Sequence, residues 1–291
     1  MKSSISKAFA VAGLAAASCT ASASIVSIST SNTAVASHSG NLISNGSFET
    51  RNVGDPAITN NVNWSGVQGQ HLAFSQGSGA VYAIPAWAQS SGAGAYGVWG
   101  SAAAQGGAAC TDGVACLYFG NHHTYAGAGV TPTFNANGTV TFSSTPTFTN
   151  FSPINQTPTT LSQVLTGLVI GDTYLLDFWT SGEDNTTSLP NPGVFGLNIG
   201  NDSLFLTAPS INSVFSAASK RYQVTFTATS TSEAVSFVNW GHIAPSPTQF
   251  SNRTELILDD VIVNHVPEPG TLALALGGVL LSCSVRQKKR S

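Results

Sequence analysis

Short runs in which apolar and polar residues alternate fill the chain between Leu42 and Val263. The segment Arg221–Thr227 places apolar side chains on one face and polar side chains on the other, and Thr173–Thr180 alternates with the same period of two. Side chains of an extended strand point alternately to opposite faces, so this pattern predicts strands with one buried face. Outside the two ends of the chain, no long stretch has the 3.6-residue period of a helix.

Turn-forming Gly, Pro, Asn and Ser residues separate these runs, which predicts many short strands and an all-β sandwich or barrel. One domain, residues 41–265, accounts for the pattern. The clearest predicted strands are Asn61–Gly66, Ala95–Trp99, Cys116–Phe119, Gly138–Phe142, Thr160–Leu165, Thr173–Thr180, Val194–Ile199, Arg221–Thr229, Glu233–Trp240 and Glu255–Val263.

The N-terminal residues have the three-part layout of a secretory signal peptide. Lys2 and Lys7 precede the small apolar run Ala8–Ala17, and an Ala-Ser-Ala sequence ends at Ala23. We therefore expect a signal helix over residues 1–23 with cleavage after Ala23. Cys19 leaves a lipoprotein as the alternative. Residues 24–40 are rich in Ser and Thr, and we interpret them as a linker.

The last 26 residues combine a proline-rich motif, a short apolar run and a basic end. Proline breaks regular structure before the run, and the positive charges resist translocation across a membrane. This layout resembles the PEP-CTERM sorting tail of exported bacterial proteins. The resemblance implies recognition by an exosortase, brief anchoring in the inner membrane, and release to the envelope, cell surface or extracellular matrix. The motif residues are Val266, Pro267, Glu268 and Pro269, and the residues that stop translocation are Arg286, Lys288, Lys289 and Arg290.

The apolar segment of this tail, Thr271–Val285, has 15 residues, whereas a stable membrane span needs about 20. That length favours a processing signal. An ordinary C-terminal transmembrane anchor is the alternative.

Charged residues are only 8% of the chain, against about a quarter in ordinary globular proteins. Between Ser24 and His265, four basic and twelve acidic residues give a formal charge of −8. Without a basic stripe, the chain lacks the electrostatic footprint of a nucleic-acid-binding protein. Ser, Thr, Asn, Gln and Gly must instead form its surface, which is compatible with a polysaccharide environment.

Cys110 and Cys116 are the two cysteines of the predicted domain. In an exported protein, a closely spaced pair favours a disulfide. A zinc site that also uses His122 and His123 is the alternative, although this spacing is not a standard zinc pattern.

Three segments, taken in order, resemble the galactose-binding-like jelly rolls that include many carbohydrate-binding modules. They are Asn41–Glu49, Leu161–Tyr174 and Leu256–Val263. The resemblance implies that the first and last strands lie together and that a structural calcium ion sits between them. Glu49 and Asp259 match the acidic positions of that site, since calcium takes oxygen ligands. The alternative is that Glu49 pairs with Arg51 or caps a turn, and that Asp259 and Asp260 form a solvated strand end.

Sugar contact would use aromatic faces, and Trp87 is the first candidate because its surroundings are typical of a loop. Tyr82 and Trp99 are further candidates, although a buried core position is the alternative for each. Signatures of hydrolases, metalloproteases and nucleotide-binding enzymes are absent from the sequence, which favours a non-enzymatic protein. We expect a structural or adhesive protein in exopolysaccharide. A dedicated carbohydrate-binding module is the second hypothesis and an envelope glycosidase the third.

Overall fold

The computed structural model describes residues 23–31, 38–50, 71–73, 84–89, 96–100, 111–113, 115–119, 123–150, 160–184, 193–208, 210–212, 220–244 and 254–267. Every regular element in these ranges is a β-strand. None of the described residues belongs to a helix with the length and apolarity needed to cross a membrane. The predicted signal helix and C-terminal helix lie outside the described residues.

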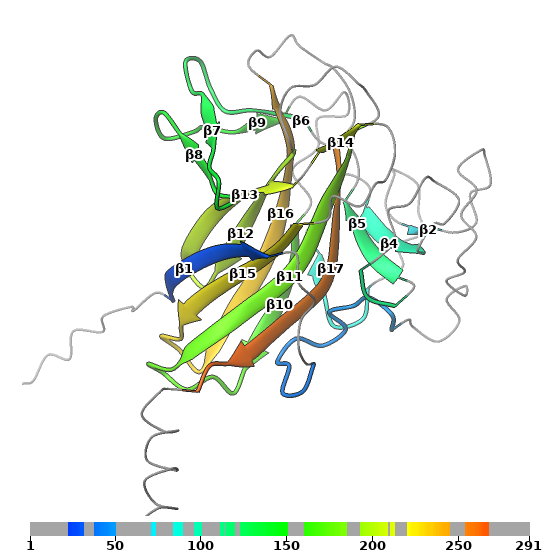
Figure 1. Cartoon of the computed structure of the whole chain (residues 1–291), viewed down its shortest axis with the longest axis vertical. Helices are drawn as coiled ribbons and strands as arrows, with labels where there is room; N and C mark the ends of the chain where they lie inside the picture. Colours follow the sequence, from blue (N-terminus) through cyan, green and yellow to red (C-terminus); the bar gives the residue numbers. More distant parts are fainter. Residues whose placement is uncertain are drawn as a thin grey trace, which may run out of the picture.

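Two sheets face each other in the described part of the chain (Figure 1). The larger sheet has the order β1 (Ser24–Ser31), β15 (Lys220–Thr227), β11 (Thr173–Asp184), β17 (Thr254–His265), β5 (Ala115–Phe119), β4 (Tyr96–Gly100) and β2 (His71–Ala73), and β14 (Ser210–Asn212) pairs with β11. The smaller sheet has the order β13 (Asp202–Ala208), β12 (Gly193–Ile199), β16 (Ser232–Ala244), β10 (Thr160–Thr166) and β3 (Ala88–Gln89), and β6 (His123–Tyr125) joins β16 to β9 (Thr149–Asn150). A separate hairpin pairs β7 (Pro132–Phe134) with β8 (Val140–Phe142).

From β10 onward the chain crosses repeatedly between the sheets, so strands that follow one another in sequence are often not neighbours in a sheet. The apolar faces predicted from the alternating pattern meet between the sheets. Phe178 of β11 and Phe237 of β16 touch edge to face across the core, with ring centroids 5.1 Å apart. The β-sandwich predicted from the sequence is confirmed.

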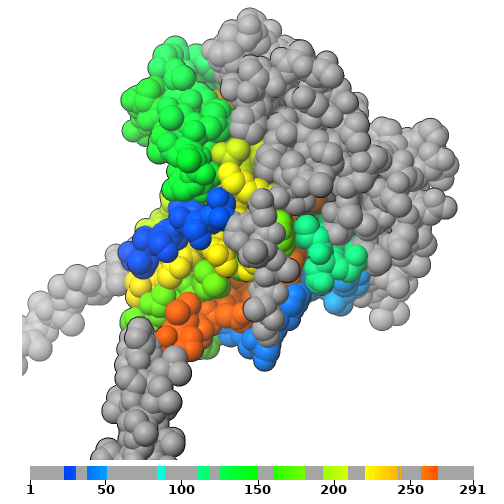
Figure 2. All heavy atoms as spheres, viewed as in Figure 1, coloured from blue at the N-terminus to red at the C-terminus, as the bar shows by residue number. Residues whose placement is uncertain are grey.

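The segment assigned to a linker is in part a strand, so that boundary was wrong. Ser24–Ser31 forms β1 and pairs antiparallel with β15. A register shift between Ile25 and Ser27 places Ile25 and Ile28 against the core, although residues three apart in a regular strand face opposite ways. This irregular spacing breaks the alternation of apolar and polar residues from which the other strands were predicted. Figure 2 shows β1 in dark blue on the surface of the molecule.

The opening segment Asn41–Glu49 docks against β17 near the end of the domain, as the sequence resemblance implied. The Leu42 N–H donates to the Val263 carbonyl, and the Val261 N–H donates to the Gly46 carbonyl. The Asn41 side chain adds two bonds, because its Oδ1 accepts the Val263 N–H and its Nδ2 donates to the Val261 carbonyl. We call this contact the clasp. In Figure 2 the opening segment (light blue) lies beside β17 (orange).

The clasp needs glycine at position 46. A Cβ there would lie 2.0 Å from the carbonyl oxygen of Val261, a distance that the backbone of β17 cannot accommodate without moving.

The β7–β8 hairpin is fixed to the sandwich through Tyr222, which is fully buried. The Tyr222 hydroxyl lies 2.6 Å from the Thr207 carbonyl and 3.1 Å from the Gly138 carbonyl. Gly138 has a φ of +85°, and a Cβ there would meet the Tyr222 ring at 2.5 Å. Both backbone conformation and space therefore require glycine at this turn.

We expect Gly138→Ala to lower the free energy of unfolding by roughly 2 to 4 kcal/mol, because it adds a clash to backbone strain. Gly167→Ala is the matched control, since Gly167 has a φ of +78° but nothing within 4 Å of its added Cβ. The control should lose only about 1 to 2 kcal/mol. Urea unfolding of both variants measures the difference. Equal losses would show that the hairpin is not held against Tyr222 as described.

Candidate functional site

Two buried aspartates, Asp259 and Asp260, lie at a bulge in β17. The β11–β17 pairing runs from Asp177 opposite Ile262 to Trp179 opposite Asp259, so β17 carries one extra residue in this interval. Asp260 lies in the bulge with a φ of +51°, a left-handed conformation that aspartate tolerates better than most residues. Asp259 and Asp260 are 2% and 6% exposed. The alternative in which they form a solvated strand end is therefore wrong.

Asp259 anchors the loop that precedes β5. Its Oδ2 accepts the N–H groups of Thr111 and Asp112 and the Thr111 hydroxyl, and its Oδ1 accepts the N–H of Asp260. Burial raises the pKa of Asp259 to about 8, although these hydrogen bonds favour the charged form and oppose the shift. Glu49 binds where this loop enters β5, because its Oε1 accepts the N–H of Ala115, the first residue of the strand, at 2.7 Å.

These hydrogen bonds use the oxygens that would have to bind the calcium ion implied by the family resemblance. Three of these donors saturate Oδ2 and the fourth binds Oδ1, so the Asp259 carboxylate, with about four lone-pair sites, keeps little acceptor capacity for a cation. Glu49 also gives one oxygen to the loop backbone. The pair Glu49 and Asp259 therefore fits a loop anchor better than a calcium site.

A buried ion pair lies on β11 and β15 beside the bulge. The Arg221 guanidinium donates from Nε and an Nη to the two oxygens of Asp177, and Gln223 Nε2 donates to Asp177 Oδ2 at 3.0 Å. Arg221 is 4% exposed and Asp177 is 2% exposed. Removing either charge would leave the other buried and uncompensated, so this pair has a structural role. Both oxygens of Asp177 are thereby engaged.

Asp260 faces a second group of polar side chains. Its Oδ1 lies 3.2 Å from His38 Nε2, and Asp112 completes a group whose ligand-type atoms all lie within 4.8 Å of one another. Burial is the largest effect on the Asp260 carboxyl and raises its pKa. His38 and Arg221 oppose that shift, whereas the nearby charges of Asp112 and Asp177 add to it.

The aromatic residue chosen first for sugar contact is in the core, so that prediction was wrong. Trp87 is 5% exposed and stacks on Phe48 with ring centroids 5.7 Å apart. Its indole N–H donates to the Asn45 carbonyl at 3.0 Å. A positive φ at Phe48 and at Asn45 shapes the turn that covers the ring. Tyr82 lies outside the described residues, and Trp99 is described only as part of the β4 backbone.

Cys116 is part of a disulfide, as the sequence predicts. Its expected partner, Cys110, lies outside the described residues, so the pairing itself stays a prediction. The structure places Val266 and Pro267 of the sorting motif directly after β17, where the Val266 N–H donates to the Thr173 carbonyl. Glu268, Pro269 and the basic residues Arg286, Lys288, Lys289 and Arg290 lie outside the described residues.

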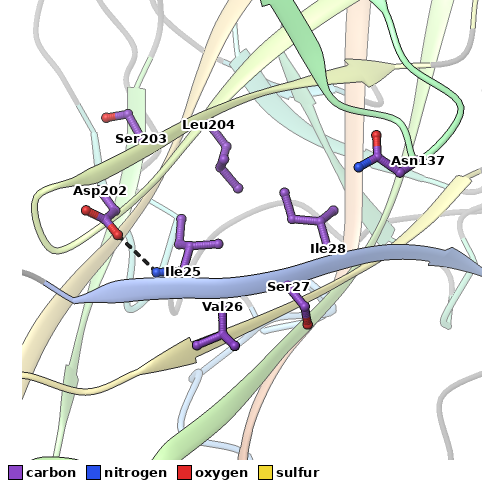
Figure 3. A pocket seen from close by; sticks show the side chains of 8 residues that line it. All are labelled: Ile25, Val26, Ser27, Ile28, Asn137, Asp202, Ser203 and Leu204. Atoms are coloured by element: carbon purple, nitrogen blue, oxygen red, sulfur yellow. Dashed lines mark hydrogen bonds between the residues drawn. The ribbon is translucent and has the colours of Figure 1, made fainter.

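A surface hollow of about 400 Å³ separates β1 from β13, the strands that end the two sheets on the same side in the described part of the sandwich. Figure 3 shows Ile25, Ile28 and Leu204 pointing toward one another, with Asp202 and Asn137 at opposite ends. One Asp202 oxygen accepts the Ile25 N–H at 3.0 Å. We call this hollow the edge groove. It combines an aliphatic floor with a carboxylate and an amide, whereas the hydroxyls of Ser27 and Ser203 point away from that floor.

The edge groove was not predictable from the sequence, because its residues come from three separate segments and one of its walls, β1, was assigned to a linker. The pairing of His38 with Asp260 was not predictable either, since 222 positions separate the two residues and no local motif joins them. The signal that could have found them is the docking of Asn41–Glu49 on β17, which brings His38 to the bulge.

No family model matches the chain, and no curated protein matches it. Among solved structures, the enzymatically active domain of tailspike protein 4 from bacteriophage CBA120 aligns with 78% of this chain at 11% identity and a TM-score of 0.36. The chain spans only 21% of that tailspike domain.

Two smaller proteins also align with the chain. TmCBM61 in complex with β-1,4-galactotriose covers 62% of this chain and is itself covered to 88%, at 13% identity and a TM-score of 0.28. A Bacteroides thetaiotaomicron protein with a proposed sugar-binding role covers 78% and is itself covered to 100%, at 11% identity and a TM-score of 0.34. These values are too low to carry a ligand or an activity over to this chain.

We expect Asp259→Ala to lower the free energy of unfolding by about 2 to 4 kcal/mol, because it leaves backbone donors of the Thr111–Gly113 loop without acceptors. Asp172→Ala is the control, since Asp172 pairs with the half-exposed His265 at 2.9 Å and should lose no more than about 1 kcal/mol. Denaturant unfolding measures the stability, and limited proteolysis measures the opening of the loop. A variant with native stability and a protected loop would contradict the anchoring role.

Proposed function

We propose that the protein is an exported component of a bacterial envelope or extracellular matrix, in which its sandwich contacts exopolysaccharide in a structural or adhesive role. An exosortase processes its PEP-CTERM-like tail after brief anchoring in the inner membrane. In this role the protein binds or holds matrix components and catalyses no reaction. A dedicated carbohydrate-binding module is the second candidate, and the edge groove is the observation that favours it.

Two observations support the export part of this proposal. Cys116 is disulfide-bonded, and disulfides persist mainly in oxidising compartments outside the cytosol. The described part of the smaller sheet also carries a network of hydroxyl and amide groups. On the smaller sheet, Ser203 donates to Asn198 Oδ1 and Asn198 Nδ2 donates to Ser236 Oγ, which forms a polar ladder across three strands.

The edge groove is the single observation that carries the sugar contact. A pyranose ring has apolar C–H faces and a rim of hydroxyls, so it requires an apolar surface bordered by hydrogen-bonding groups. Ile25, Ile28 and Leu204 supply that surface, while Asp202 and Asn137 supply an acceptor and an amide. Its volume lies within the range of about 300 to 1,000 Å³ that is typical of small-ligand sites. The groove is therefore sized for one or two sugar units.

We expect the purified protein to bind a subset of bacterial polysaccharides on a glycan array, and Asn137→Ala to weaken that binding about 5- to 10-fold through the loss of one or two hydrogen bonds. Asn201→Ala is the matched control, because Asn201 is an exposed amide in the neighbouring β12–β13 turn and does not line the groove. Binding affected equally by both changes would place the sugar contact elsewhere. If no polysaccharide binds, the sugar-contact part of the proposal is wrong.

The sorting part is tested separately by replacing Pro267, Glu268 and Pro269 with alanines. The mature wild-type protein should lack the residues after the motif, and the variant should keep its tail and stay in the membrane fraction. Mass spectrometry of the mature C-terminus and cell fractionation measure the two effects. An intact wild-type tail that ends at Ser291, or identical release of both forms, would contradict sorting.

A further inference from the structure

We propose that His38, Asp112 and Asp260 form a binding site for a divalent transition-metal ion of the zinc type, which fastens three distant chain segments at the β17 bulge. This site is distinct from the calcium position at Glu49 and Asp259 that the sequence resemblance implies. It is also independent of sugar binding in the edge groove.

Geometry is the first observation that supports the site. One ligand atom from each of the three side chains lies within 4.8 Å of the other two. Ligands of a tetrahedral ion at about 2.1 Å are about 3.4 Å apart, so the 3.2 Å between His38 Nε2 and Asp260 Oδ1 is already close to that spacing. The Asp112 ligand atom lies within 4.8 Å of the other two, so it must approach them by up to about 1.4 Å to reach that spacing, and the half-exposed His38 side chain can also move.

Asp260 provides the second, independent observation. Its side chain is 8% exposed, and its Oδ1 accepts no hydrogen bond although it is buried. Buried polar atoms in native proteins almost always have a partner, and either a protonated His38 or a cation shared with His38 would supply one here. Oδ1 is also the atom that faces His38 Nε2. Its neighbour Asp259 differs in this respect, because four donors surround that carboxylate.

Ligand chemistry selects the class of metal. Calcium and magnesium take oxygen ligands, whereas an imidazole nitrogen suits zinc, copper, nickel and iron. One imidazole and two carboxylates form a mixed nitrogen and oxygen set, and water can fill a fourth position. A dication would also neutralise the two like charges of Asp112 and Asp260, which otherwise repel each other in a partly buried place.

The bound ion would join three parts of the fold. His38 lies at the start of the segment that forms the clasp, Asp112 belongs to the loop before β5, and Asp260 is the bulge residue of β17. Binding to the folded state alone stabilises that state by mass action. The ion would thus couple the stability of the clasp to that of the loop that Asp259 anchors.

The test uses the purified, untagged protein with its disulfide intact, stripped of metal with EDTA and titrated with zinc chloride in a calorimeter. We expect one zinc ion per chain and a rise in Tm of roughly 5 to 10 °C at a hundredfold excess over Kd. His38→Gln and Asp260→Asn should each weaken binding by at least about 10-fold, since loss of even an outer partner of a metal ligand costs that much. His265→Gln is the matched control, because His265 also pairs with an aspartate on the surface.

Absence of zinc binding by the wild-type protein would overturn the proposal. Equal weakening by His38→Gln and His265→Gln would do the same, because it would reveal adventitious binding to surface histidines. Tighter binding of calcium than of zinc at a site that His38→Gln abolishes would overturn the metal class. Asparagine tolerates the left-handed backbone of position 260, so Asp260→Asn adds no backbone strain. The His38 side chain is half-exposed, so we expect His38→Gln to fold, and this variant alone is enough to decide the test.

Discussion

The contact between the opening segment and β17 is the interaction on which the rest of the described structure depends. Asn41 and Gly46 bind the backbone of Val261 and Val263, which joins positions more than 200 residues apart. The backbones approach so closely that Gly46 has no room for a Cβ. The opening segment lies along β17 at Val261 and Val263, beyond the part of β17 that pairs with β5. The contact brings His38, which precedes the segment, close to Asp260 of β17.

The bulge in β17 determines what those side chains can do. In a regular strand, Asp259 and Asp260 would point to opposite faces. The extra residue lets both become buried, but in different surroundings: Asp259 is surrounded by loop donors, whereas Asp260 faces His38 and Asp112. One carboxylate therefore holds a loop, and the next one is left with a buried oxygen that lacks a hydrogen bond. The difference between them comes from the backbone, because their chemistry is identical.

The sequence predicted the features that depend on local periodicity. Alternation in 173–180 and 221–227 predicted β11 and β15. That the two ends of the domain meet was implied by the family resemblance of Asn41–Glu49 and Leu256–Val263, and not by periodicity. Features that depend on irregular backbone or on distant contacts were not predictable in this way. The register shift in β1 disguised a strand as a linker, and the turn at Asn45 and Phe48 buried Trp87, which sequence alone placed in a loop. His38 and Asp260 become neighbours only through the clasp.

Two surfaces with different chemistry result, and they lie on different parts of the sandwich. The edge groove between β1 and β13 is mainly aliphatic with one carboxylate and one amide at its ends, which suits a sugar, whereas the bulge cluster is charged and suits a cation. The most direct test of the claim that the clasp assembles a metal site is anomalous diffraction at the zinc edge from crystals equilibrated with zinc. The account predicts a single ordered peak about 2.0 to 2.2 Å from His38 Nε2 and from the carboxylates of Asp112 and Asp260. An ordered peak at Glu49 and Asp259 with none beside His38 would contradict it.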